Sequence, residues 1–209
     1  MGEIKIGKIT LGMCQTNTYF LYREGNPDAV IIDPADKGGY LYDKLSENGL
    51  EIKAILLTHG HFDHIWGIEG IKEKTDAKVY ASEDEKDLLL DDRKNCSAQC
   101  GRSCKIKADH YLKDDEVIDL CGMKIKMLKT PGHTEGGCCF YIEEAGFLIS
   151  GDTLFCESVG RTDLPTGSMS TLVRSIKDKL MVLPKDTKVY PGHGSPTSIE
   201  YEKEYNPFL

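Results

Sequence analysis

Several features that mark membrane, secreted or multidomain proteins are missing from the 209 residues of this sequence. No apolar run approaches the roughly 18–20 residues of a membrane-spanning helix. The N-terminal stretch carries Glu3, Lys5 and Lys8 among its apolar residues, so it lacks the apolar core of a signal peptide. Repeats, low-complexity tracts and linkers rich in Pro, Gly or Ser are also missing. We therefore expect residues 1–209 to form one cytoplasmic domain without a membrane partner.

Basic charge is also scarce, with 26 Lys and Arg residues against 34 Asp and Glu residues and a formal net charge of −8. Because nucleic acids and anionic membranes attract basic surfaces, we expect neither as the main partner. The hydrophobic and charged fractions, 40% and 29%, are those of an ordinary globular chain. They exclude collagen, a coiled coil and a wholly disordered chain.

Histidine is rare, with six residues, whereas there are eight cysteines. Disulfide frameworks are typical of short secreted chains, so we expect these thiols to be free, buried or metal-binding. Cys96, Cys100 and Cys104 repeat every four residues, a spacing that on a helix would place three thiols on one face. Soft metals and iron–sulfur clusters favour such ligands. The sequence leaves a metal or redox role for these three cysteines open.

Apolar periodicity predicts strands that alternate with helices in both halves of the chain. This pattern favours two sheets flanked by helices over a single doubly wound sheet. A polar, Cys-rich loop is expected at 91–110 and a short polar tail after the last strand. The expected strands are 4–9, 19–22, 29–32, 53–57, 78–81, 117–120, 124–128, 138–142, 147–150 and 188–190, and the expected helices are 39–48, 63–75, 82–90 (N-cap Ser82) and 168–183 (N-cap Ser168 or Ser170).

The strongest chemical signal is the segment Thr58-His59-Gly60-His61-Phe62-Asp63-His64, directly after an apolar strand. His59 and His61 are two residues apart, so on extended backbone they point to the same side. Asp63 and His64 then fall at a turn or helix start. Imidazole together with carboxylate suits Zn, Mn, Fe or Ni better than Ca or Mg, which prefer oxygen ligands alone.

Three more glycine-rich turns each carry a ligand-type residue just after an apolar strand. They contain His133 in 130–134, Asp152 in 150–155 and His193 in 190–194. Functional residues commonly lie on loops that a rigid scaffold holds. With the first cluster, these turns provide five histidines and two aspartates, which are enough for two metal ions and a bound water.

These four elements, in this order, resemble the metallo-β-lactamase superfamily, whose motif His-x-His-x-Asp-His is followed by His, Asp and His. The resemblance implies a four-layer αββα sandwich of the α/β (α+β) class and two divalent metal ions, with zinc expected and iron or manganese as alternatives. It implies a first metal bound by His59, His61 and His133, a second bound by Asp63, His64 and His193, and a bridging ligand, Asp152. Metal-bound histidines usually donate their other N–H to an oxygen, which makes Asp33, Thr58 and Thr134 candidates for that role.

Such a site supports hydrolysis, because metal ions lower the pKa of a bound water and polarise a carbonyl. The resemblance implies a hydroxide bridging the two metals, with Asp63 and Asp152 as its catalytic carboxylates. Zinc β-lactamases typically carry Cys or Ser at the position of Asp152, and flavodiiron proteins carry Glu at the position of His61. Antibiotic hydrolysis and redox chemistry are therefore disfavoured.

Segments outside the ligands resemble the glyoxalase II-like branch, which cleaves hydroxyacyl thioesters. The segments are 15–19, 152–155, 159–165 and 206–208. Arg161 stands nine residues after the bridging Asp, where glyoxalase II has a basic residue that contacts glutathione, and a guanidinium suits a carboxylate. The chain departs from glyoxalase II at Asp163, often an aromatic there, and in lacking its C-terminal helical domain. It is closest to the short, single-domain members, so the expected substrate is a small-molecule thioester of unassigned thiol carrier.

Three alternatives remain open. Persulfide dioxygenases share this core and often the segment 160–163, but hold one iron with two His and one Asp. Another small-ester or lactone hydrolase of the same superfamily would use the same site. A metal-binding or regulatory protein without activity is the third alternative.

Overall fold

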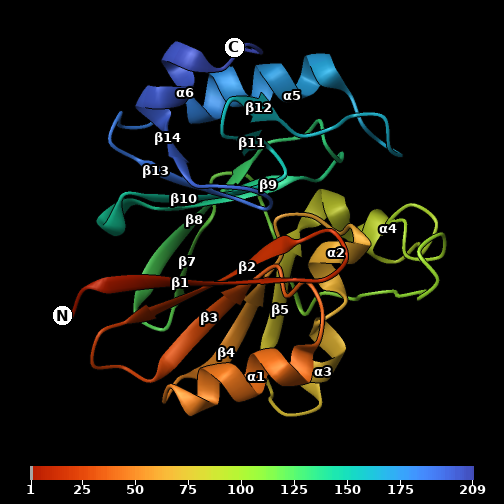
Figure 1. The fold of residues 1–209 in the computed structure, drawn as a ribbon, viewed down its shortest axis with the longest axis vertical. Helices are drawn as coiled ribbons and strands as arrows, with labels where there is room; N and C mark the ends of the chain where they lie inside the picture. Colours follow the sequence, from red (N-terminus) through yellow and green to blue (C-terminus); the bar gives the residue numbers. More distant parts are fainter. Residues whose placement is uncertain (1) are drawn as a thin grey trace.

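The computed structural model describes residues 2–209. Two six-stranded sheets pack face to face, and each is covered by helices on its outer side, which gives four layers (Figure 1). Helices α1 and α3 cover one sheet, and α5 and α6 cover the other. The αββα sandwich expected from the sequence is confirmed.

The first sheet is formed by the N-terminal half of the chain, in sequence order. Its first three strands are antiparallel, and the remaining pairs are parallel. The strands are β1 (Ile4–Leu11), β2 (Thr16–Arg23), β3 (Asp28–Ile32), β4 (Glu51–Leu56), β5 (Lys78–Ser82) and β6 (His110–Leu112).

The second sheet is formed by the C-terminal half, and a separate two-stranded ribbon, β11 (Leu154–Phe155) with β12 (Ser158–Val159), adjoins it. The strand order across this sheet is β14 (Thr197–Ser198), β13 (Lys188–Pro191), β10 (Phe147–Gly151), β9 (Cys138–Ile142), β8 (Met123–Lys129) and β7 (Val117–Leu120).

The helices are short. They are α1 (Gly38–Glu47), α2 (Phe62–Ile65), α3 (Ile68–Lys72), α4 (Lys86–Leu89), α5 (Met169–Ser175) and α6 (Ile199–Tyr205), together with 3₁₀ turns at Glu83–Glu85 and Glu143–Ala145 and a π-helical turn at Ile176–Leu180.

Three apolar layers hold the sandwich together. In β3, Ile31 faces the layer under α1 and α3, whereas Val30 and Ile32 face the second sheet. This alternation follows from the two-residue period of a strand, and it explains why a strand buried on both faces reads as a continuous apolar run. The third layer lies between the second sheet and α5, where Leu172 is fully buried.

Two expected helices are interrupted. The helix expected at 63–75 is two helices, α2 and α3, because the chain bends at Gly67, whose N–H donates to the carbonyl of Pro34 (2.8 Å). A Cβ on Gly67 would lie 2.7 Å from that same carbonyl oxygen, so only glycine allows this approach. The helix expected at 168–183 changes to the π-helical turn after Ser175, and its N-cap is Ser168, which accepts from the N–H of Thr171.

Three other expectations were wrong. Ser82 precedes the 3₁₀ turn at Glu83–Glu85 rather than α4, and its side chain makes no capping hydrogen bond. The end of the expected loop, His110, begins strand β6, where its ring stacks on Tyr80. The expected polar tail contains β14 and α6, because buried Ile199 anchors the helix and Ser198 caps it by accepting from the N–H of Tyr201.

The carboxyl ends of β4, β8, β10 and β13 are followed by the loops that hold the predicted ligands. The two sheets meet there directly, since the N–H of Cys138 donates to the carbonyl of Thr58 (2.8 Å). Gly151, with a φ of +49°, lies so close to the Thr58 side chain that a Cβ would be 2.2 Å from its hydroxyl. Within residues 2–209, no helix is long and apolar enough to cross a membrane.

Candidate metal centre

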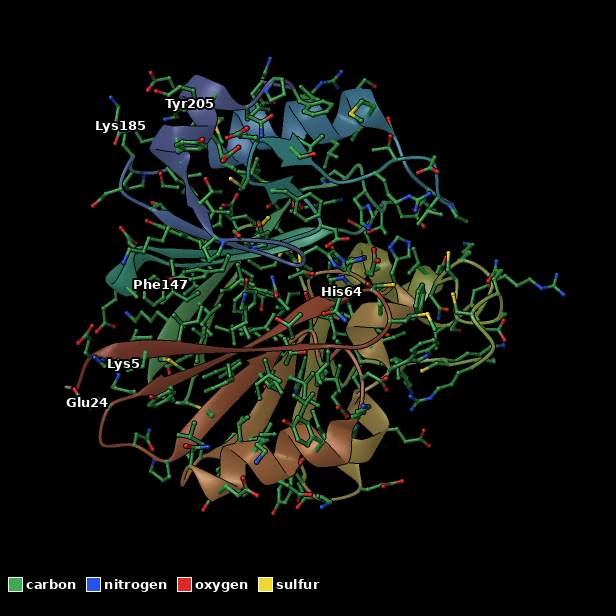
Figure 2. All side chains as sticks on the ribbon, viewed as in Figure 1. Lys5, Glu24, His64, Phe147, Lys185 and Tyr205 are labelled. Carbon is green, nitrogen blue, oxygen red and sulfur yellow. The ribbon has the colours of Figure 1, made fainter. Side chains whose placement is uncertain are left out.

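The predicted ligands from four separate loops converge at the edge where the two sheets meet. Figure 2 places His64, a residue of α2, there, between the two halves of the sandwich. The candidate ligand atoms of His59, His61 and His133 lie within 4.8 Å of one another. Nδ1 of His61 is 2.9 Å from Nε2 of His133. Three imidazoles this close have the spacing needed to hold one metal ion.

A second cluster of the same spacing consists of Asp63, His64 and His193. Asp152 lies between the two clusters. Its carboxylate oxygens are 3.5 Å from Nε2 of His64, 3.6 Å from Nε2 of His133 and 3.4 Å from Nε2 of His193. The structure therefore brings together all seven residues that the sequence analysis predicted as ligands, in two groups of three with one carboxylate between them.

Unpartnered buried atoms indicate that these groups are built to hold cations. Among the described residues, Nε2 of His59, His61 and His64 and Oδ1 of Asp152 are buried without a hydrogen-bond partner. Leaving such atoms unpaired costs free energy, which a coordinated ion would recover. Imidazole and carboxylate are also the donors that Zn, Fe and Mn accept. The residues thus fit a pair of divalent ions.

The pKa shifts of His61 in the first cluster and His64 in the second go in opposite directions. Burial and the neighbouring His133 lower the pKa of His61 to about 3, so its imidazole is neutral and free to coordinate. For His64, burial lowers the pKa, but Asp63 and Asp152 more than offset this and raise it to about 9. In the metal-free protein, a proton on His64 offsets the negative charge of Asp63 and Asp152. In the metal-bound protein, two cations would neutralise this charge instead.

Oxygen atoms orient the imidazoles on the N-terminal side. Asp33 accepts from the backbone N–H (2.8 Å) and the hydroxyl (2.6 Å) of Thr58. The Thr58 hydroxyl in turn lies 3.2 Å from Nδ1 of His59, and Oδ2 of Asp33 lies 3.0 Å from Nδ1 of His64. With Nδ1 as the donor in both imidazoles, each Nε2 faces its cluster and is able to bind a cation there once it carries no proton.

Backbone carbonyls orient two further histidines. Nδ1 of His133 is 2.7 Å from the carbonyl oxygen of Arg161, and Nδ1 of His193 is 3.1 Å from that of Cys14. The Thr16 hydroxyl donates to Oδ2 of Asp63 (2.8 Å). The carbonyls of Arg161 and Cys14 and the hydroxyl of Thr16 were not predicted from the sequence. Each of them contacts a residue far away in the chain, so no local sequence pattern indicates it.

Thr134 does not support a histidine directly, contrary to the expectation. Its hydroxyl donates to Oε2 of Glu85 (3.0 Å), while the N–H of Gly60 donates to Oε1 of the same carboxylate (2.8 Å). Glu85 is 1% exposed, and burial raises its pKa to about 7. The sequence analysis missed this residue because it lies in an acidic stretch typical of a solvated helix face.

Five of the seven predicted ligands line an open cavity of about 700 Å³, namely His61, Asp63, His133, Asp152 and His193. Phe155, Leu164 and Pro165 line the same cavity. Arg161 also lines it, with a side chain that is 63% exposed. Its guanidinium is held by Asp163 through two contacts, Nε to Oδ1 (2.7 Å) and Nη2 to Oδ2 (2.6 Å).

All eight cysteines are free thiols. Cys96 and Cys100 line the cavity, but Cys104 packs against the first apolar layer. The segment forms turns, and Cys96 has a φ of +65°, so the three thiols do not share a helix face. Cys138 and Cys139 are buried in the second and third apolar layers.

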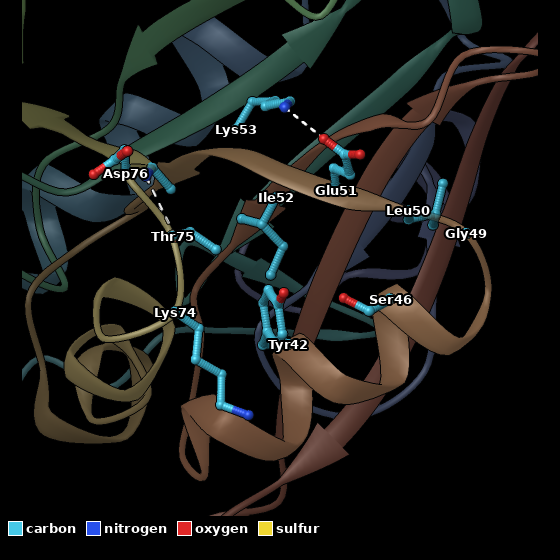
Figure 3. A pocket seen from close by; sticks show the side chains of 11 residues that line it. Tyr42, Ser46, Gly49, Leu50, Glu51, Ile52, Lys53, Lys74, Thr75 and Asp76 are labelled. Atoms are coloured by element: carbon cyan, nitrogen blue, oxygen red, sulfur yellow. Dashed lines mark hydrogen bonds and ion pairs between the residues drawn. The ribbon is translucent and has the colours of Figure 1, made fainter.

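Another cavity, of about 520 Å³, lies at the start of β4, remote from the carboxyl end of that strand (Figure 3). It is lined by Tyr42, Ile52 and Lys74 among others, and by none of the seven predicted ligands. Figure 3 shows Lys53 paired with Glu51 beside it. This cavity offers polar surface but no ligand set comparable with the histidine clusters.

The fold and the His/Asp clusters define a metal-dependent hydrolase. Residues 11–193 match the family model described as the metallo-beta-lactamase superfamily, and the chain belongs to this superfamily. It is 38% identical over 209 residues to the probable metallo-hydrolase YqgX of Bacillus subtilis, covering 99% of this chain and 98% of that one. It is 37% identical over 188 residues to the hydroxyacylglutathione hydrolase GloC of Haemophilus influenzae, covering 87% of each.

Two solved structures extend the comparison. BLEG-1, described as a B3 metallo-beta-lactamase, superposes with a TM-score of 0.93 at 38% identity and covers 98% of this chain and 99% of its own. TTHA1623 in a di-iron-bound form gives a TM-score of 0.86 at 34% identity, covering 97% and 100%. A pair of metal ions thus occurs in a protein similar to this one.

Proposed function

We propose that this chain hydrolyses a small hydroxyacyl thioester at a binuclear metal site. The observation that carries the proposal is the convergence of seven buried or half-buried ligand-type side chains, four of which have unpartnered atoms and five of which line a partly apolar cavity. The similarity to GloC, a hydroxyacylglutathione hydrolase, supports the thioester as the bond that is cleaved. We propose zinc as the resident metal, and the di-iron form of TTHA1623 keeps iron as the alternative.

In this proposal, His59, His61 and His133 hold one ion, Asp63, His64 and His193 hold the other, and Asp152 contacts both. Two divalent ions held by these residues would lower the pKa of a bound water and polarise the substrate carbonyl. The Thr16 hydroxyl donates to Oδ2 of Asp63, the oxygen that lies 3.4 Å from Nε2 of His193, and so holds this carboxylate beside the second cluster, where it would orient the attacking water. Asp152 keeps its negative charge, because the pKa of this carboxyl, which burial raises, is lowered overall by His64 and His193.

The cavity walls provide the contacts for the substrate. Phe155, Leu164 and Pro165 form an apolar surface that suits an alkyl or thioether portion. Arg161 is proposed to contact the thiol carrier at the rim. Because the Arg161 guanidinium is already paired with Asp163, we expect Arg161 to bind a substrate carboxylate more weakly than an unpaired arginine would.

Metal analysis combined with three activity assays tests the proposal. The protein as purified is analysed for zinc, iron and manganese, then assayed for thiol release from a hydroxyacyl thioester, for persulfide-dependent oxygen uptake and for hydrolysis of a chromogenic β-lactam. We expect two metal ions per chain and thiol release as the fastest reaction. One iron per chain with oxygen uptake would replace the proposal by a persulfide dioxygenase. Faster β-lactam cleavage would replace it by a β-lactamase, the activity named for BLEG-1.

A further inference from the structure

Glu85 is a buried carboxylate beside the metal centre. It ends the 3₁₀ turn that follows β5, and only 1% of its surface is exposed. Within residues 2–209 it forms no ion pair with a lysine, arginine or histidine. Its partners are the N–H of Gly60 on Oε1, the hydroxyl of Thr134 on Oε2, and the backbone of Gly136.

The partners of Glu85 belong to two different ligand loops. Gly60 lies between His59 and His61. A hydrogen bond to its N–H therefore fixes the backbone that joins these two histidines. Thr134 directly follows His133. One carboxylate therefore connects the loop that carries two imidazoles of the first cluster to the loop that carries the third. The two loops are 72 residues apart along the chain at His61 and His133.

Both loops also press directly on the segment that carries Glu85. A Cβ on Gly60 would lie 2.8 Å from the side chains of Leu88 and Leu89. A Cβ on Gly136 would lie 2.2 Å from the backbone nitrogen of Glu85. At Gly136 the clash would be with backbone atoms, so glycine permits an approach that any other residue would prevent, whereas at Gly60 the ends of the two leucine side chains would have to shift. The segment between the two loops and its one buried carboxylate therefore help to fix the distance between them, together with the hydrogen bond from the N–H of Cys138 to the carbonyl of Thr58.

A buried carboxylate without a cationic partner costs free energy, even when it accepts hydrogen bonds. An apolar residue of similar size would fill this position at lower cost if packing were the only requirement. The role that distinguishes Glu85 from such a residue is its ability to accept hydrogen bonds from both loops at once.

We propose that Glu85 is a positioning residue for the metal centre, which holds the loop of His59 and His61 at a fixed distance from the loop of His133. The three imidazoles then meet a single ion without further rearrangement. This role rests on the proposed metal ligands, but it does not depend on which substrate the site cleaves. A measurement of metal binding can therefore test it separately from the thioester assay.

The test is a competitive titration of the metal-free full-length protein with Zn²⁺ against a chromophoric chelator. Glu85→Leu removes both acceptors, and Thr134→Val removes one donor with little change in shape. We expect each variant to bind one of the two ions about 10- to 100-fold more weakly, the range for partners that orient ligands. Thr134→Ser keeps the hydroxyl and should restore affinity close to the wild-type value.

A matched control is offered by Glu202 on α6, which is also fully buried and accepts hydrogen bonds from Thr197, Glu157 and Asn206. Glu202→Leu should lower the melting temperature and leave both zinc affinities unchanged. Wild-type zinc affinity in Glu85→Leu and Thr134→Val would overturn the proposal. An equal loss in Glu202→Leu would also overturn it, because general destabilisation would then explain the effect. Wild-type protein that binds fewer than two ions would overturn the ligand assignment and this role together.

Discussion

Asp33 is the residue whose replacement best tests how the metal centre is organised. It accepts three hydrogen bonds, two from Thr58 and one from Nδ1 of His64. Through Thr58 it reaches Nδ1 of His59, so one carboxylate orients an imidazole in each cluster. We predict that Asp33→Asn weakens metal binding at both clusters while the chain still folds.

The substitution changes one acceptor into a donor and little else. Asp33 has a φ of +50°, a conformation that asparagine tolerates better than most residues. Asparagine Oδ1 can still accept from the N–H of Thr58, but its amide nitrogen would face the Thr58 hydroxyl and Nδ1 of His64. To avoid opposing a donor with a donor, His64 must move its proton to Nε2, the atom that faces the second cluster.

The expected loss of affinity is about 10- to 100-fold per ion, the range for substitution of such a partner. This corresponds to about 1.4 to 2.7 kcal/mol. Competitive titration with Zn²⁺ measures it, and Asp36→Asn is the matched control, since Asp36 lies three residues on and pairs with Arg102 at the surface (3.1 Å). Two zinc ions bound by Asp33→Asn with wild-type affinity would refute the proposed orientation of His59 and His64.

Three further predictions concern the same site. Asp152→Ala should lose metal and thioesterase activity together, because its carboxylate contacts both clusters; turnover with full metal content would contradict the bridging assignment. Asp163→Asn should free the Arg161 guanidinium and lower KM for a thioester of a carboxylate-bearing thiol by a factor of about 1.5 to 5, as expected from breaking an exposed ion pair, with no change for an uncharged thioester. An equal change in KM for both substrates would show that Arg161 does not bind the carboxylate. In the metal-free protein, burial lowers the pKa of His64 but neighbouring carboxylates raise it to about 9. Protonated His64 thereby adds at most about 3 kcal/mol to the free energy of unfolding. This contribution is complete below pH 6.5 and is lost as the pH rises through 9. The melting temperature of metal-free protein should therefore fall between pH 6.5 and 9.5, and a curve that is flat without metal but falls with zinc would contradict this reasoning.

Local sequence determined the ligand types and the strands that precede them. His59 and His61 follow an apolar strand, and His133, Asp152 and His193 each follow another, because a two-residue period and a glycine-rich turn are properties of neighbouring residues. The family resemblance then predicted the αββα layers. The substrate contacts were harder to predict from the sequence, because the pairing of Arg161 with Asp163 depends on the conformation of a loop.

Tertiary structure decided which atoms support those ligands. The helix break at Gly67 is set by contact with Pro34, about 30 residues away in the chain, and the helix at 199–205 is anchored by one buried isoleucine. The hydrogen bonds of Asp33 to His64 and of Glu85 to Gly60 and Thr134 join segments 25 to 49 residues apart. Periodicity and capping rules read only residues within a few positions of one another. Long-range contacts of single side chains leave no such local pattern, so only the folded chain determined them.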